Sequence, residues 1–307
     1  MRSSNSTFRP QLFALDNRSV PSASIVAIGN TLSIRADNIA SFISIRDDGK
    51  GDINATVKSA NETVSSVNAH INRIAIVGSP GNDTVDFRLT AAMHSHLALD
   101  MNLGAGNDHA YMDFYAGIVD TSLSVKLLGG AGNDSVDAQF GKLTNASVDY
   151  RASLGDGADS STVALFNGAS GHTHANFDVA GNSGSDHVNF IAMGTIDAAA
   201  RVTFHAENQA NANDRLTARY RGELDGTLKV VVDKAAAKYG VQSYFLLDPA
   251  STGTLIAIVR DNSGTCGSTL RVTDHSDGAI RSDIDRLDHC LTEPDGARVT
   301  HFDPAWI

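Results

Sequence analysis

The chain is poor in residues on which many other kinds of protein depend. Its 307 residues include only two cysteines, six prolines and one tryptophan, which excludes a small scaffold held together by disulfides. The longest apolar runs, such as residues 255–259, fall far short of the ~18 residues that a transmembrane helix needs. Basic residues number 24 against 35 acidic ones, for a net charge of -11. This balance argues against a nucleic-acid partner, whose phosphates require clustered Lys and Arg.

What the sequence does contain is a repeat. A Gly-Asn-Asp tripeptide, or a variant of it, recurs along the chain, and the steps between its aspartates are 25, 26, 25, 27 and 28 residues. The aspartates are Asp83, Asp108, Asp134, Asp159, Asp186 and Asp214. A period of this length is typical of solenoids, in which each repeat forms one coil and stacks on its neighbours.

Each repeat also contains alternating apolar residues. Two, four and six residues after one of the aspartates lie Val136, Ala138 and Phe140, separated by polar residues, and a period of two is typical of a half-buried strand. A unit of two or three short strands cannot bury its apolar face alone, whereas a stack of such units can. We therefore predict an all-β fold, a parallel β-helix with rungs of ~25 residues about 4.8 Å apart. The crossover rule makes it right-handed.

The ends of the chain depart from the repeat. Strand patterns around the turn at residues 47–52 predict a hairpin-containing β cap, which covers the open edge of the first rung. Near the C-terminus the Gly-Asn-Asp marker is lost. There Cys266 and Cys290 lie 24 residues apart, close to one rung, which predicts a disulfide between adjacent rungs. The predicted parts are residues 1–22 (N-terminal segment), 23–77 (β cap), 78–232 (β-helix with GxGND turns) and 233–307 (degenerate rungs and C-terminal cap).

The turns resemble the hemolysin-type calcium-binding nonapeptide, GGxGxDxUx, of the bacterial RTX proteins. The match is carried by residues 104–108 and 130–134, both Gly-Ala-Gly-Asn-Asp. The resemblance implies that Ca²⁺ is held between neighbouring turns by aspartate carboxylates and glycine carbonyls. The ligands implied in this sequence are Asp83, Asp108, Asp134, Asp159, Asp186, Gly106 and Gly132. The motif occurs once per rung and not in tandem, so the resemblance does not extend to the tight RTX β-roll.

The column of aspartates has two interpretations. Carboxylates at equal phase in neighbouring rungs repel one another by roughly 1 to 3 kcal/mol per pair at a surface dielectric, and a cation with oxygen ligands relieves this repulsion. In the alternative no cation is needed. Asparagines such as Asn107 then bond along the stack, and each aspartate caps backbone N–H groups of its own turn. A single carboxylate per turn provides few charged ligands, which favours this Asn/Asp ladder.

Two sets of histidines occupy the same positions in two repeats. They are His94, His96 and His109, and His172, His174 and His187. Three rungs separate the two sets, so they cannot form a shared metal site. We interpret them as solvent-facing histidines on polar strand faces.

The N-terminal residues carry a second resemblance. Residues 8–22, FRPQLFALDNRSVPS, resemble the RPxLExLExRxVPSA segment that opens many large exported surface proteins of certain bacteria, although Asp16 and residues 11–13 depart from its usual glutamates. Asp16 also interrupts the apolar residues 12–15, so no classical signal peptide is recognisable. The resemblance implies a secreted or cell-surface bacterial protein, with cell-envelope or extracellular polymers as its partners.

The sequence shows no recognisable catalytic motif. The carboxylate pairs Asp83/Asp86 and Asp134/Asp137 are expected on one outward face, but they derive from the repeat and have no Lys or Arg at the same phase. We therefore predict a non-enzymatic, exported β-solenoid with a structural or adhesive role. The alternative is a carbohydrate-active β-helix, a polysaccharide lyase or hydrolase, which requires a groove of convergent carboxylates and aromatic residues.

Overall fold

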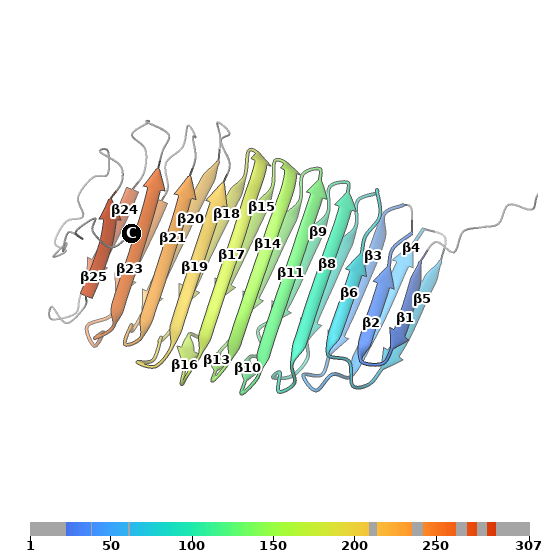
Figure 1. The fold of residues 1–307 in the computed structure, drawn as a ribbon, viewed down its shortest axis with the longest axis horizontal. Helices are drawn as coiled ribbons and strands as arrows, with labels where there is room; N and C mark the ends of the chain where they lie inside the picture. The colour runs from blue at the N-terminus through green and yellow to red at the C-terminus, as the bar shows by residue number, and fades with distance from the viewer. Residues whose placement is uncertain are drawn as a thin grey trace, which may run out of the picture.

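The structure is a computed structural model, and it describes residues 23–37, 39–60, 62–208, 214–234, 242–261, 269–274 and 281–286. The described chain is all β and is coiled into a β-solenoid (Figure 1). In that view the front strands run upward while the chain advances from right to left, so the coil is right-handed. The parallel β-helix predicted from the repeat is confirmed. In the described ranges, no helix is long and apolar enough to cross a membrane.

Two long sheets form the opposite sides of the coil. Sheet A, at the front of Figure 1, has 11 strands, and all neighbours after the first pair are parallel. Its strands in spatial order are β1 (Ser24–Ile28), β2 (Thr31–Arg35), β6 (Arg73–Val77), β8 (Leu97–Ala105), β11 (Ser122–Ala131), β14 (Ser147–Gly157), β17 (His174–Gly184), β19 (Arg201–Asn208), β21 (Thr227–Lys234), β23 (Thr254–Asp261) and β25 (Arg281–Arg286).

Sheet B lies behind sheet A and also has 11 strands. From the C-terminal end they are β24 (Thr269–Asp274), β22 (Gln242–Leu247), β20 (Arg215–Gly222), β18 (His187–Met193), β15 (Ser160–Leu165), β12 (Ser135–Phe140), β9 (His109–Phe114), β7 (Thr84–Leu89), β3 (Ser41–Asp47), β4 (Ile53–Ser59) and β5 (Thr63–Asn68). A third, small sheet closes the lower corner with β10 (Ile118–Val119), β13 (Leu143–Thr144) and β16 (Ala169–Ser170).

The N-terminal cap is built from antiparallel strands, as the hairpin pattern predicted. β1 pairs antiparallel with β2, and β3, β4 and β5 form an antiparallel meander. β2 and β3 then pair in parallel with β6 and β7, so the cap joins directly onto the first rung of both sheets. At the other end, β23, β24 and β25 extend the sheets after the Gly-Asn-Asp marker has been lost. The N-terminal segment 1–22 and both cysteines lie outside the described residues.

The core is a continuous column of apolar side chains between the sheets. The alternating residues predicted to face inward are buried, including Val136, Ala138 and Phe140, none of which is measurably exposed. Aromatic side chains from both sheets also contact one another in this core. Ring centroids of the aromatic chain Phe87, Phe114, Phe140, Phe177, Phe190 and Phe204 lie between 4.2 and 6.1 Å apart from one neighbour to the next. Such contacts add to the free energy gained by burying apolar area.

The aromatic column gives a first prediction. Phe140 is fully buried, and its ring centroid lies 5.1 Å from that of Phe114 and 5.0 Å from that of Phe177. We expect Phe140→Ala to lower the free energy of unfolding by about 3 to 5 kcal/mol, because it removes both contacts and leaves a cavity. Val67 is 79% exposed, so Val67→Ala should change the free energy of unfolding by less than about 0.5 kcal/mol in the same denaturant titration. Equal effects of the two substitutions would contradict a core stacked in this way.

Candidate functional site

The Gly-Asn-Asp turns stack directly on one another at one corner of the coil. Glycine is required there because positive φ angles and close backbone approach coincide. Gly132 has φ 129°, and a Cβ atom on it would lie 1.9 Å from the carbonyl oxygen of Gly106 in the rung before. Its own N–H donates to the carbonyl of Asp156 in the rung after, at 2.8 Å. The turns therefore form a backbone-to-backbone stack with no room for side chains at these positions.

The asparagines form the outer ladder of this stack. The N–H of Asn107 donates to Oδ1 of Asn82, and the N–H of Asn133 donates to Oδ1 of Asn107, both at 2.8 Å. The backbone N–H of Ala158, which replaces asparagine in its turn, continues the ladder by donating to Asn133 at 2.7 Å. Each asparagine thus binds the next rung, as the ladder interpretation predicted for these residues.

The aspartates form an inner ladder that runs in the opposite direction. Oδ1 of Asp108 accepts the N–H of Asp83 in the preceding rung, and Oδ1 of Asp134 accepts that of Asp108, at 2.7 and 2.8 Å. Asp159, Asp186 and Asp214 repeat this contact. The expectation that each aspartate caps its own turn was wrong, because the carboxylate points across the stack to the neighbouring turn. Asp83, at the start of the ladder, differs from the others.

Asp83 binds the rung before it, as the other aspartates do, and in addition caps its own turn. Its Oδ1 accepts the N–H of Ser41 from the cap at 2.7 Å, and its Oδ2 accepts the N–H of Ser79 at 2.5 Å. The hydroxyl of Ser79 also donates to Asp83, at 3.1 Å. Sequence reasoning missed both serines, since neither belongs to the repeat. The Ser at the head of the Ser79-Pro80-Gly81-Asn82-Asp83 turn was the available signal for one of them.

The aspartate column is buried. The repulsion between its carboxylates was expected at a surface dielectric, but these carboxylates are not at the surface. Asp108, Asp134, Asp159 and Asp186 are at most 2% exposed, and the Oδ2 atom of each is buried without a hydrogen-bond partner. Burial raises the pKa of Asp108 to about 7, with the charges of Asp134 and Asp83 adding to the effect. Burial likewise raises the pKa of Asp159 and of Asp186 to about 6. Protonation of part of the column near neutral pH relieves the repulsion between carboxylates without any cation.

The seven residues predicted as calcium ligands come together at this corner, but their geometry fits the ladder better than a calcium site. From Asp108 onward each carboxylate uses Oδ1 for a backbone N–H, which leaves one oxygen per rung, and both oxygens of Asp83 are used, whereas Ca²⁺ takes about six to eight oxygen ligands. Gly106 and Gly132 lie two residues before the aspartates of their turns, and their N–H groups donate to backbone carbonyls of the next rung. Within the described ranges, no group of three or more His, Cys, Asp or Glu side chains is arranged to hold a metal ion.

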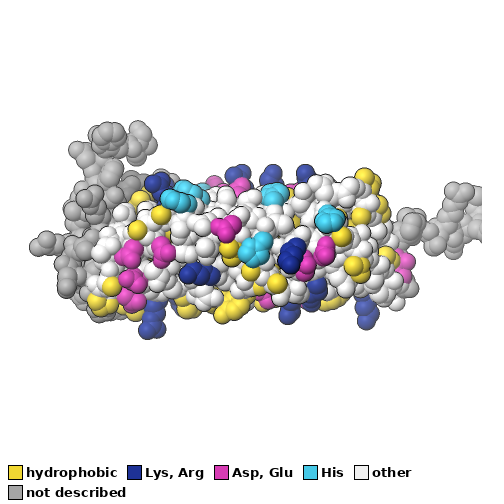
Figure 2. Space-filling view, turned by 90° about the horizontal axis from the view of Figure 1, so that it is seen from below, with side chains coloured by type: hydrophobic (Ala, Val, Ile, Leu, Met, Phe, Trp, Pro, Cys, Tyr) yellow, Lys and Arg dark blue, Asp and Glu magenta, His cyan; other side chains and the backbone are white. Residues whose placement is uncertain are grey.

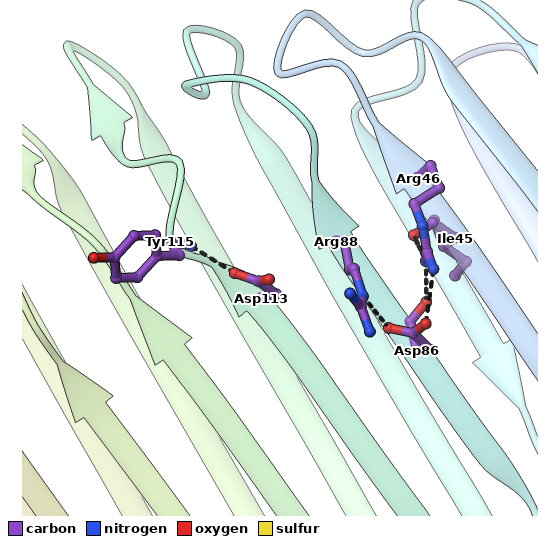
Figure 3. Close-up of polar contacts among 6 residues, drawn as sticks. All are labelled: Ile45, Arg46, Asp86, Arg88, Asp113 and Tyr115. Carbon is purple, nitrogen blue, oxygen red and sulfur yellow. Dashed lines mark hydrogen bonds and ion pairs between the residues drawn. The ribbon is translucent and has the colours of Figure 1, made fainter.

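The carboxylate pairs considered for catalysis do not form. Asp83 and Asp134 are buried in the corner, whereas Asp86 and Asp137 lie on the outer side of sheet B. The prediction of a shared outward face was wrong because strands β7 and β12 begin only after the buried aspartate. The carboxylate of Asp86 lies 2.7 Å from Arg46 and 2.9 Å from Arg88 (Figure 3). These contacts lower the pKa of its carboxyl, although burial acts against this. A carboxylate neutralised in this way is a poor general acid.

The histidines noted in the sequence do not converge. Figure 2, which views the corner that carries β10, β13 and β16, shows histidine side chains spaced along the long axis among charges of both signs. Nδ1 of His96 lies 2.8 Å from Oγ of Ser122 in the next rung. This neighbour is a hydroxyl and not a further metal ligand, in keeping with the interpretation of these histidines as surface residues.

Comparison with known proteins gives no match: no protein-family model, no curated protein and no solved structure matches this chain.

Proposed function

We propose that the chain is a non-enzymatic structural or adhesive element, exported to the bacterial cell surface or secreted. One observation carries the proposal: the repeated carboxylates are buried and accept backbone N–H groups of neighbouring rungs. The repeated carboxylates therefore serve to join neighbouring rungs. On the outer face, the charge of Asp86 is neutralised by two arginines. Export is supported by the resemblance of residues 8–22 to the opening segment of exported surface proteins.

Cell fractionation tests this proposal. We expect the protein in the envelope fraction or the culture medium, where external protease digests it while a cytoplasmic marker stays intact. Deleting residues 1–22 should retain the protein inside the cell if that segment directs export. Full-length protein found only in the cytoplasm would contradict export, and release of reducing ends from polysaccharides by the purified protein would favour the carbohydrate-active alternative.

Calcium binding is a second candidate role, favoured by the unpartnered Oδ2 atoms of Asp108, Asp134, Asp159 and Asp186. Ligands that bind the folded state raise the melting temperature by mass action. From the ladder we expect the melting temperature to change by less than about 1 °C between millimolar calcium and chelator, because a single free oxygen per rung binds calcium weakly. A rise of several degrees that is absent from the Asp108→Ala/Asp134→Ala variant would instead establish a calcium site.

A further inference from the structure

A groove crosses the outer side of sheet B near its C-terminal end. It has a volume of about 480 Å³ and is lined by strands β18, β20 and β22. The outward side chains that line it are Ile191, Met193, Arg219, Arg221, Tyr244 and Leu246. The parallel register arranges them in two columns along the coil axis, in each of which an arginine lies between an apolar residue of β18 and one of β22.

The two arginines of this groove are not engaged in ion pairs with other described residues. They are Arg219 and Arg221, and both are exposed. Strands β15, β18, β20 and β22 contain no aspartate or glutamate. At the opposite end of the same sheet, by contrast, Asp86 pairs with both neighbouring arginines (Figure 3). The outer faces of these strands therefore carry positive charge without a carboxylate between them, although Glu223 and Asp248 directly follow the ends of β20 and β22.

The groove combines two kinds of contact. A guanidinium is a planar fork that binds a carboxylate through two parallel hydrogen bonds. The guanidinium carbon of Arg219 lies 5.9 Å from the ring centroid of Tyr244, and this cation–π contact orients it. Tyr244, Met193 and Leu246 offer apolar surface beside the charges. On one strand, Arg219 and Arg221 stand roughly 7 Å apart, so the groove presents separate anion-binding points along an apolar floor.

We propose that this groove binds an acidic polysaccharide, with uronate carboxylates on Arg219 and Arg221 and the apolar face of a sugar ring on Tyr244. The two arginines lie on the same strand, β20, so an extended chain lying along that strand meets both charges, with apolar residues of β18 and β22 on either side. A nucleic acid fits less well, because its closely spaced phosphates require many basic contacts. This inference rests on the proposed adhesive role and gives it a partner.

Calorimetric titration of the full-length protein with polygalacturonate tests the site. We expect the wild type to bind, and the Arg219→Gln/Arg221→Gln variant to lose about tenfold or more in affinity, because two charge-assisted contacts are removed. Tyr244→Ala should also weaken binding. Arg151→Gln is the matched control, since Arg151 is an exposed arginine on sheet A with a side chain 58% exposed. Thermal melting of each variant identifies any loss that comes from unfolding.

Several outcomes would overturn the site. Unchanged affinity in the double arginine variant, equal binding of neutral galactan, or tighter binding of a single-stranded oligonucleotide would each do so. An absence of polygalacturonate binding by the wild type would also remove the site, but it would leave the structural role intact. Cleavage of bound polygalacturonate would instead support the binding site but contradict the proposed non-enzymatic function.

Discussion

Raising the pH from about 5 to about 8 is expected to lower the melting temperature of the protein. The pKa of Asp108 is raised to about 7, and those of Asp159 and Asp186 to about 6, above the ordinary value of 3.8. Between the ordinary pKa and the raised pKa values, the folded chain binds more protons than the unfolded chain. The free energy of unfolding therefore falls as the pH rises through this range. The stabilisation is complete below pH ~4 and is lost as the pH passes through the folded-state pKa values. Each kcal/mol lost lowers the melting temperature by roughly 2 to 4 °C.

The pH effect can be assigned to the ladder by substitution. Asp108→Asn retains the Oδ1 atom that accepts the N–H of Asp83 but does not titrate, so we expect a smaller decrease in melting temperature over the same pH range. Exposed Asp52 provides the control, since Asp52→Asn should leave the decrease unchanged. The lowered pKa of His187 acts in the opposite direction near pH 6. An Asp108→Asn variant with the full pH dependence of the wild type would contradict the assignment.

Gly132→Ala is expected to cause the largest loss of stability of any single substitution considered. A Cβ atom would lie 1.9 Å from the carbonyl oxygen of Gly106, and the φ of 129° is unfavourable for alanine. The clash is with the backbone of the preceding rung, which cannot yield as a flexible side chain could, so the two rungs must separate. We expect a loss of more than about 4 kcal/mol in denaturant titrations, or failure to fold.

A matched glycine separates the clash from backbone strain. Gly29 also has a positive φ, 61°, but no atom lies within 4 Å of the position that a Cβ would occupy. Gly29→Ala should therefore lose only about 1 to 2 kcal/mol, the usual penalty for a left-handed conformation. Similar losses for the two variants would mean that close stacking of the turns is not what requires glycine at position 132.

The fold could be predicted because two periods in the sequence agree, the spacing of the aspartates and the alternation of apolar residues. The spacing of the aspartates gives the rung, and the alternation after them gives the buried face, as at Val136, Ala138 and Phe140. A one-residue error in register would turn all of these side chains to solvent, so the pattern determines the strand positions. The repeat also placed the aspartates and asparagines in columns, and both columns are present.

The direction of the carboxylates could not be predicted in the same way. Strand alternation does not extend through a turn in which glycines adopt positive φ, so the inward position of Asp134 depends on the conformation of Gly130 and Gly132. The arginine groove was missed for a different reason. Arg219 and Tyr244 are register neighbours, but the marker that would align their rungs is absent after Asp214.

The central claim is that the repeated aspartates form a buried, partly protonated ladder that holds the rungs together. Carbon NMR of the labelled protein, titrated in the presence of a calcium chelator, measures the pKa of each aspartate carboxyl directly. We predict that Asp108 titrates with a pKa of about 7 and that Asp159 and Asp186 titrate with pKa values of about 6. If all of them titrate near the ordinary value of 3.8, the column is solvated and charged, and the account of the ladder is wrong.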